Sequence, residues 1–307
     1  MRIVFLGTSA FACPALNALT RVHDIALVIT QPDRPAGRKR ELRLSAVKNV
    51  SLGLGLPIAQ PERINSEEGI DLVREAAPEA IVVASYGQFL STKVFSPPPR
   101  GTINIHASLL PRYRGAAPIN WAIIRGETET GVTTFFIEKG MDSGEILVQR
   151  ACPIGSDDTA GELHDRLASL GAEAIMETLR SIEKGTAHPT PQREEEATLA
   201  PKLFRADGEI DWSKSALDIH NLVRGLNPWP GAFTHLGSET MKIHRTALTG
   251  ISRGKIEPGI IALQETGRLL VGTGDELIEI VEIQREARPC TSGKSFLNGL
   301  RGSSHFS

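Results

Sequence analysis

Apolar residues in the first half of the chain form short runs that alternate with longer amphipathic segments. The runs at 3–6, 25–29, 80–84 and 102–105 are continuous enough for strands buried in a parallel sheet. Runs at 131–136 and 146–152 predict two further strands. Helical spacing predicts helices after Gly7 and over 46–54, 66–76 and 159–184, with Thr8 or Ser9 capping the first. This alternation predicts a doubly wound α/β domain over 1–188.

The second half of the chain has a different pattern. Residues 189–201 are polar and without periodicity, which predicts a linker. A helix over 215–225 then precedes short strand-like runs at 240–244, 259–263, 268–272 and 277–283, a spacing that predicts a small β-barrel domain over 202–307. We expect Trp212, Trp229 and Phe233 to pack where helix and barrel meet, and the Gly/Ser-rich tail from Gly299 to Ser307 to be frayed.

Length and composition are those of an ordinary globular protein. The 307 residues suggest two domains, with 40% hydrophobic and 23% charged residues. No apolar run approaches the roughly 20 residues that span a bilayer. The apolar run at the N-terminus is a predicted strand and is too short for a signal peptide, so we expect a cytoplasmic protein without membrane contact. Three widely spaced cysteines (Cys13, Cys152 and Cys290) argue against a disulfide framework and against a zinc site.

The turn after the first strand argues against two common cofactor classes. It reads Gly7-Thr8-Ser9, which is not the G-x-G-x-x-G of dinucleotide-binding proteins, and the chain contains no Walker A sequence. The turn still presents free amides at a helix N-terminus, where an anion can bind. An ordinary capped turn explains it at least as well.

Three polar residues make the candidate site. Asn104 and His106 lie two apart on a predicted strand, so both side chains point the same way, at the strand end where open α/β sheets bind ligands. Asp142, in the later segment Gly140-Met141-Asp142-Ser143-Gly144, could complete the group. An amide and a protonated imidazole can stabilise a carbonyl oxygen that becomes negative, and a carboxylate can take a proton from an attacking amine.

This trio lacks an activated nucleophile, because no Ser, Cys or Lys stands beside the histidine in an evident way. The chemistry it predicts is therefore direct acyl transfer between two bound substrates, without a covalent enzyme intermediate. The alternative is structural: Asn104 would cap a turn and His106 would be a core histidine with satisfied hydrogen bonds.

The segment from Asn104 to Ile119, which reads NIHASLLPRYRGAAPI, resembles the folate-dependent formyltransferases. Three further segments narrow the resemblance to the branch that acts on methionyl-tRNA: they begin at Gln31 (QPDRPAGR), Lys202 (KLFRADGEIDW) and Asn227 (NPWPGAF). The resemblance covers the chain from Met1 to about Gly299. It implies a Rossmann-like formyltransferase domain followed by an OB-like barrel that binds tRNA.

The resemblance also implies the reaction and its substrates. The donor would be 10-formyltetrahydrofolate, and the acceptor would be the α-amine of initiator methionyl-tRNA, with Asn104, His106 and Asp142 as catalytic residues. Neither a metal nor a nicotinamide is needed, and we expect a monomer. The residues that would bind folate lie in three loops, and they are Tyr86, Gly87, Ser108, Leu109, Leu110, Pro111 and Met141.

Positive charge for RNA must be local, because the net charge is −2 and the sequence pI is about 6.5. The segment from Gln31 to Arg43 supplies it and reads as an extended loop at the sheet edge that carries His106. By the resemblance this loop recognises the acceptor arm, with Arg38 as its central arginine; the full set is Arg34, Arg38, Lys39, Arg40 and Arg43. A solvated loop without a partner is the alternative.

Two other functions remain open from the sequence. A formyltransferase that acts on glycinamide ribonucleotide or an amino sugar nucleotide would share the trio, but a small acceptor requires neither the basic loop nor the barrel. A non-catalytic tRNA-binding protein on the same fold would have no use for all three polar groups. Folate binding by the purified protein separates the second alternative from the enzymes.

Overall fold

The chain folds into two compact units in a computed structural model that describes residues 1–36, 41–262, 267–300 and 305–307. The N-terminal unit comprises 1–115, 130–153 and 164–199, and the C-terminal unit comprises 116–129, 154–163 and 200–307. The linear boundaries predicted from the sequence remain a prediction. Within the described ranges, no helix is both long and apolar enough to cross a membrane.

A seven-stranded sheet forms the centre of the N-terminal unit, in the order β10-β9-β7-β6-β1-β2-β5. The five strands from β7 to β5 run parallel, and β9 is antiparallel to β7. The strands are β1 (Arg2–Gly7), β2 (Asp24–Ile29), β5 (Ile58–Ala59), β6 (Ala80–Ala84), β7 (Thr102–His106), β9 (Glu129–Phe136) and β10 (Ile146–Pro153). All six predicted strands are present, and the doubly wound α/β pattern is confirmed.

The four predicted helical regions of this unit are present, and α4 (Thr92–Phe95) is an additional helix that the sequence did not predict. The others are η1 (Ala10–Ala12), α1 (Cys13–Leu19), α2 (Ala46–Gly53), α3 (Glu67–Ala76) and α6 (Ala160–Lys184). One detail differs: Ser9 occupies the N-cap position of η1, but its side chain makes no capping hydrogen bond, and the N-cap of α1 is Ala12. The hydroxyls of Thr8 and Ser9 instead donate to the Tyr86 carbonyl oxygen and to the Ser85 hydroxyl, which ties two strand-end loops together.

Small residues let α6 approach the strands that carry the site. A Cβ at Gly171 would lie 2.9 Å from Ile105 Cγ2, closer than normal packing allows. The Thr178 hydroxyl of α6 also lies 2.6 Å from the Thr134 hydroxyl of β9. Helix α6 therefore covers one face of β7 and β9 and holds these strands in place.

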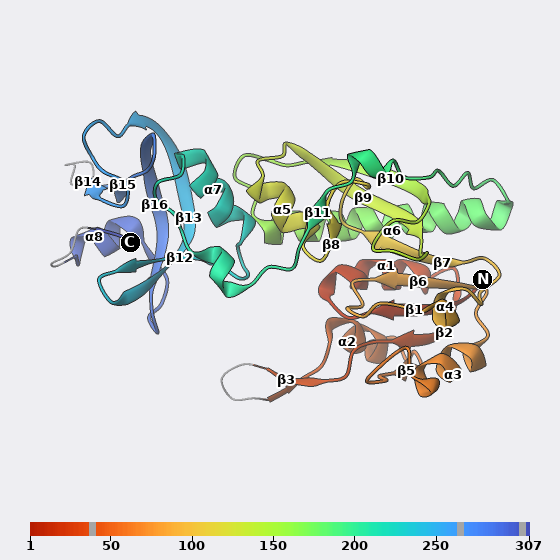
Figure 1. Cartoon of the computed structure of the whole chain (residues 1–307). Helices are drawn as coiled ribbons and strands as arrows, with labels where there is room; N and C mark the ends of the chain where they lie inside the picture. The colour runs from red at the N-terminus through yellow and green to blue at the C-terminus, as the bar shows by residue number, and fades with distance from the viewer. Residues whose placement is uncertain (37–40, 263–266, 301–304) are drawn as a thin grey trace. The chain divides into compact units, whose positions relative to one another are not determined.

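Short strands outside the main sheet complete the N-terminal unit. The basic segment forms a hairpin of β3 (Arg34–Ala36) and β4 (Glu41–Arg43), in which Arg34 pairs with Arg43, and it projects away from the sheet (Figure 1). Arg38, Lys39 and Arg40 lie outside the described residues. The segment predicted as a linker contains η2 (Glu194–Glu196) and β11 (Leu199–Ala200), which pairs with β8 (Arg114–Gly115).

An antiparallel sheet, in the order β12-β13-β16-β15-β14 with β17 beside β16, forms the C-terminal unit. The strands are β12 (Ala232–Leu236), β13 (Glu239–Ser252), β14 (Ile261–Ala262), β15 (Leu270–Gly272), β16 (Glu276–Arg285) and β17 (Thr291–Ser292); the helices are α5 (Pro118–Ile124), η3 (Arg205–Gly208), α7 (Ala216–Gly225) and α8 (Gly293–Asn298). The predicted small β-domain is confirmed. A β-bridge joins Leu236 of β12 to Phe306, and a second joins Ile260, the residue before β14, to His305. Both therefore contact the C-terminal segment 305–307.

The core of this unit corrects two predictions. The tail is not frayed throughout, because Phe306 is fully buried and stacks on Trp212 and Phe296 at ring-centroid distances of 5.8 and 6.4 Å. Trp212 packs as predicted and donates from its indole to the Thr234 hydroxyl. Trp229 does not, since it is 61% exposed. The turn that carries Trp229 contains cis peptide bonds before Pro228 and Pro230.

Candidate functional site

Strand β7 delivers Asn104 and His106 to the carboxyl edge of the sheet. Ile103 and Ile105, the residues that alternate with them, are buried, which fixes the register of the strand. In that register Asn104 lies beside Val83 of β6, and His106 lies opposite Thr133 of β9. The alternation that the sequence predicts is confirmed, and both polar side chains belong to the strand face that leads to the site.

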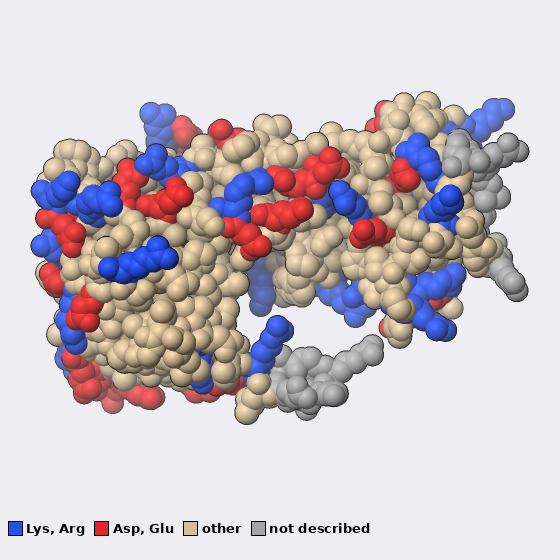
Figure 2. Space-filling model, turned by 180° about the vertical axis from the view of Figure 1, so that it is seen from behind, with Lys and Arg blue, Asp and Glu red and all other residues tan. Residues whose placement is uncertain are grey.

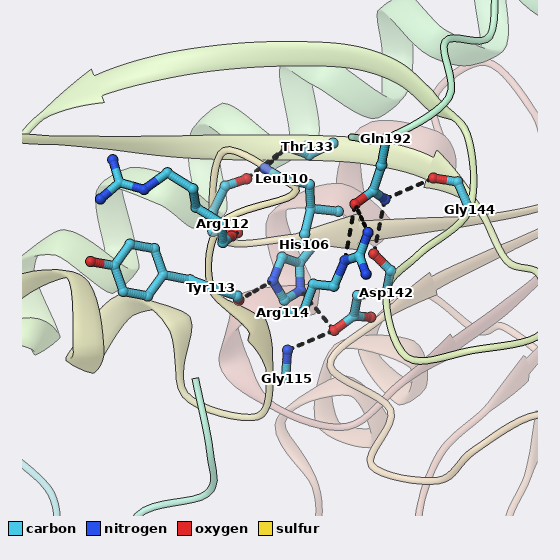
Figure 3. Close-up of polar contacts among 11 residues, drawn as sticks. His106, Leu110, Arg112, Tyr113, Arg114, Gly115, Thr133, Asp142, Gly144 and Gln192 are labelled. Atoms are coloured by element: carbon cyan, nitrogen blue, oxygen red, sulfur yellow. Dashed lines mark hydrogen bonds and ion pairs between the residues drawn. The ribbon is translucent and has the colours of Figure 1, made fainter. Parts of the chain in front are cut away.

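Hydrogen bonding fixes the ring of His106. Its Nε2 lies 2.9 Å from the carbonyl oxygen of Tyr113, and Figure 3 shows the ring between Tyr113 and Asp142. A carbonyl oxygen only accepts, so Nε2 carries a proton and donates. The other ring nitrogen, Nδ1, lies 3.7 Å from Asp142 Oδ2. Imidazole and carboxylate are thus brought together from β7 and from a loop 36 positions later, as the sequence predicts.

The loop that carries Asp142 depends on its two glycines. A Cβ at Gly144 would lie 1.8 Å from the Phe136 carbonyl oxygen, and Gly140 has φ +117° with Ser143 Oγ only 2.4 Å from a Cβ position. Asp142 itself has φ +51°, a left-handed conformation that aspartate tolerates better than most residues. The spacing Gly-Met-Asp-Ser-Gly is therefore a backbone requirement that turns the carboxylate toward His106.

The carboxylate is held on one side only. Asp142 Oδ2 accepts a hydrogen bond from the Gly115 backbone N–H at 2.8 Å. Among the described residues, the other oxygen, Oδ1, accepts no hydrogen bond, and the side chain of Asn104 makes none either. Since both groups are partly exposed, they can bond to a substrate without first breaking an internal bond.

The loop between β7 and β8 is fixed from within the protein. Thr133 Oγ1 donates to the Ser108 carbonyl oxygen at 2.7 Å and accepts from the Leu110 backbone N–H at 3.1 Å. Ser108 is buried, and its hydroxyl donates to the Arg112 carbonyl oxygen. The peptide bond between Leu110 and Pro111 is cis. Sequence reasoning missed Thr133, although its place opposite His106 on the next strand could have indicated it.

The predicted folate residues are partly brought together. Leu109, Leu110 and Pro111 follow β7, whereas Tyr86 and Gly87 follow the neighbouring strand β6. Tyr86 is buried in the core with no hydrogen-bond partner for its hydroxyl among the described residues, and burial raises its pKa to about 12. Met141, by contrast, is 42% exposed beside Asp142. Of these side chains, Met141 is the most accessible to a ligand.

The described part of the basic hairpin is exposed. Arg34 pairs with Glu62 at 2.7 Å, and Arg43 lies opposite it in the hairpin. Lys48, just beyond the hairpin, forms an ion pair with Asp33. Acidic and basic side chains are mixed over the face of the protein in Figure 2, in keeping with the small net charge.

The chain is similar in sequence to known formyl transferases. The family model described as formyl transferase matches residues 1–179, and that of the formyl transferase C-terminal domain matches 202–301. The methionyl-tRNA formyltransferase of Solibacter usitatus (strain Ellin6076) is 45% identical over 302 residues, 98% of this chain and 96% of the relative. That of Acetivibrio thermocellus is 46% identical over 285 residues, 92% of each chain.

Solved structures show the same fold at low identity. The N-formyltransferase from Helicobacter canadensis, in complex with folinic acid and dTDP-3-aminofucose, aligns over 93% of this chain and 99% of its own, with a TM-score of 0.66 and 18% identity. HypX from Aquifex aeolicus, in complex with tetrahydrofolic acid, aligns over 97% of this chain and 47% of its own, with a TM-score of 0.64 and 17% identity. The chain belongs to the formyltransferase family, within the methionyl-tRNA formyltransferases.

Proposed function

We propose that this protein transfers the formyl group of 10-formyltetrahydrofolate to the α-amine of initiator methionyl-tRNA, giving N-formylmethionyl-tRNA for translation initiation. The observation that carries the proposal is the His106–Asp142 pair beside the accessible amide of Asn104, in a chain so similar to methionyl-tRNA formyltransferases. Three polar groups with no covalent nucleophile among them suit direct transfer.

In the proposed mechanism the amine attacks the formyl carbon, and a new C–N bond forms as the carbonyl oxygen becomes negative. Asn104 Nδ2 and a protonated His106 Nδ1 donate hydrogen bonds to this oxyanion. Because Nε2 already donates to the Tyr113 carbonyl oxygen, donation from Nδ1 as well requires His106 to act as an imidazolium, with the Asp142 carboxylate 3.7 Å from Nδ1.

Asp142 has a second role when the intermediate collapses. Its Oδ1 takes a proton from the attacking amine, directly or through water. The bond between the formyl carbon and N10 of the folate then breaks, and N10 receives a proton as tetrahydrofolate leaves. Charge and atoms balance, because the proton lost by the amine is returned to the leaving nitrogen.

For the folate donor we propose a slot between the loops after β6, after β7 and around Asp142. Gly87 has φ +92° and open space at its Cβ position, so the backbone there can approach a flat ring closely. Since Tyr86, Ser108 and Leu110 are buried, we expect these residues to act through backbone groups, with Met141 and the partly exposed Leu109 and Pro111 offering apolar contact.

For the tRNA acceptor we propose contact with the basic hairpin. Arg34 and Arg43 are exposed at its base, and the sequence places Arg38, Lys39 and Arg40 between them. Phosphate contacts of this kind position a nucleic acid without reading its sequence. Initiator tRNA is present in the cytoplasm, so we propose that the protein acts there. We also propose that it is a monomer, which light scattering of the purified protein would check.

The decisive experiment compares formyl transfer from 10-formyltetrahydrofolate to methionyl-tRNA, glycinamide ribonucleotide and an amino sugar nucleotide. Turnover with the charged tRNA alone supports the proposal. Turnover with a small acceptor alone would keep the catalytic trio and refute the acceptor. If no acceptor is formylated although the protein binds both folate and tRNA, the protein is a binding protein on this fold.

A further inference from the structure

The amide of Gln192 bonds to the backbone of the loop that carries Asp142. Its Nε2 donates to the carbonyl oxygen of Asp142 at 2.9 Å and to that of Gly144 at 2.8 Å. Figure 3 shows Gln192 reaching this loop from a segment outside the sheet. Both amide hydrogens are therefore used, one on each side of the turn at Ser143.

The orientation of this amide is fixed by Arg114. The guanidinium donates to Gln192 Oε1 from Nε at 3.1 Å and from Nη2 at 2.8 Å. A guanidinium can only donate and backbone carbonyl oxygens can only accept, so a flipped amide would lose all four hydrogen bonds. The alternative amide orientation is excluded by chemistry.

Arg114 is in turn fixed by Glu194. Only 8% of the arginine side chain is exposed, and Glu194 binds it with both carboxylate oxygens, at 2.8 and 2.9 Å. The Arg114 guanidinium holds the pKa of the Glu194 carboxyl below its ordinary range. A buried cation needs such a partner, because desolvation otherwise disfavours its charge.

Asp142 is thus held at two points by the neighbouring residues Arg114 and Gly115 of β8. Gly115 donates its backbone N–H to the carboxylate, while Arg114 acts through Gln192 on the carbonyl oxygen of the same residue. The left-handed backbone of Asp142 is sparsely populated for a residue other than glycine, and such conformations persist only when surrounding contacts hold them.

We propose that Gln192, oriented by the Arg114–Glu194 ion pair, is a positioning residue that sets the Asp142 carboxylate against His106. The inference rests on the proposed function, in which Asp142 takes the proton. It makes the segment from 190 to 196 part of the active site, although the sequence alone suggests only a linker there.

The test is Gln192→Glu. Glutamate keeps an acceptor for Arg114 but replaces both amide donors by an oxygen that faces two carbonyl oxygens. We expect kcat for formyl transfer to fall about tenfold to a hundredfold, since small misplacements and lost supporting hydrogen bonds have effects of this size. The KM for each substrate and the melting temperature should stay close to those of the unmodified protein.

Hydrogen exchange supplies a readout that does not depend on activity. Amides of residues 140–145 should exchange faster in Gln192→Glu, whereas those of β1 should not change. Unchanged exchange together with an unchanged kcat would overturn the proposal. If the unmodified protein transfers no formyl group, the proposed function fails, and exchange alone still decides whether Gln192 holds this loop.

A matched pair of variants covers the possibility that Gln192→Glu does not fold. Glu194→Gln weakens the ion pair that orients Arg114, whereas Glu195→Gln removes a neighbouring charge that is also exposed and forms no ion pair among the described residues. Glu194→Gln should lower kcat and speed exchange at 140–145, and Glu195→Gln should do neither. Equal effects of the two would refute the proposal.

Discussion

Gly115 donates its backbone N–H to the Asp142 oxygen that lies nearest His106, at an N···O distance of 2.8 Å. The same oxygen is thus fixed by the main chain and faces the imidazole, while the second oxygen, Oδ1, has no partner among the described residues. A carboxylate held in this way offers one oxygen for orientation and one for a proton.

Asp142→Asn should lower kcat by about 10²- to 10⁴-fold, the range for loss of a positioned base. The asparagine carbonyl oxygen can still accept from Gly115, so folding should be nearly unchanged. Steady-state formyl transfer and thermal unfolding, measured on the same preparation, check both parts. A kcat near that of the unmodified protein would refute the role of Asp142.

Asn104→Ala tests the proposed oxyanion contact. Loss of one such donor costs about 10²- to 10³-fold in kcat. No internal hydrogen bond is lost with it among the described residues, so stability should change little. Asn17→Ala, at an exposed position of α1, is the matched control and should leave kcat unchanged. If Asn104→Ala raised only the KM for folate, the side chain would bind the donor in its ground state instead.

Arg38→Ala tests the basic hairpin. We expect a higher KM for methionyl-tRNA, an unchanged Kd for folate, and a salt dependence of tRNA binding whose slope is smaller by about 1, as for one lost phosphate contact. Arg21→Ala is the control, because Arg21 is exposed before β2 and therefore at the opposite edge of the sheet. Equal salt slopes for the two variants would count against the hairpin as the tRNA contact.

Local sequence patterns predicted the part of the site that depends on strand geometry. Ile103 and Ile105 are buried on either side of Asn104, and this alternation determines where the amide and His106 point. Parallel strand order determines that the loops after β6 and β7 meet at one edge. These relationships follow from the periodicity of side chains and need no knowledge of distant contacts.

Long-range contacts between polar residues could not be predicted in this way. Gln192 bonds to Asp142 across 50 positions, and nothing in its polar neighbourhood indicates the partner. The tail was predicted to fray because glycine and serine dominate it, yet the single aromatic residue there, Phe306, completes a core around Trp212. The burial predicted for Trp229 is wrong for the opposite reason: hydrophobicity predicts burial, but the residue lies in a turn and is 61% exposed.

His220 is buried in the C-terminal unit. Its Nε2 lies 3.1 Å from the carbonyl oxygen of Ser156, which can only accept, so Nε2 donates; Nδ1 lies 2.9 Å from the Thr246 hydroxyl. Burial lowers the pKa of His220 below its ordinary value of about 6.5. Of the groups around it, the Ser156 carbonyl and the Asp157 carboxylate raise this pKa, whereas the cationic side chains of Arg224 and Arg245 lower it.

The pH dependence of stability follows from the number of protons that each state binds. Below pH 6.5 the unfolded chain binds a proton at His220, whereas the folded protein binds it only when the pH falls to the lower folded pKa. The free energy of unfolding should therefore fall as the pH falls below about 6.5, by at most about 1.4 kcal/mol per pH unit for this one group. Tryptophan fluorescence can follow the unfolding of the C-terminal unit, because Trp121, Trp212 and Trp229 all belong to it. His220→Gln, which keeps a donor for Ser156, should flatten the slope between pH 5 and 7; an unchanged slope would show that other groups cause it.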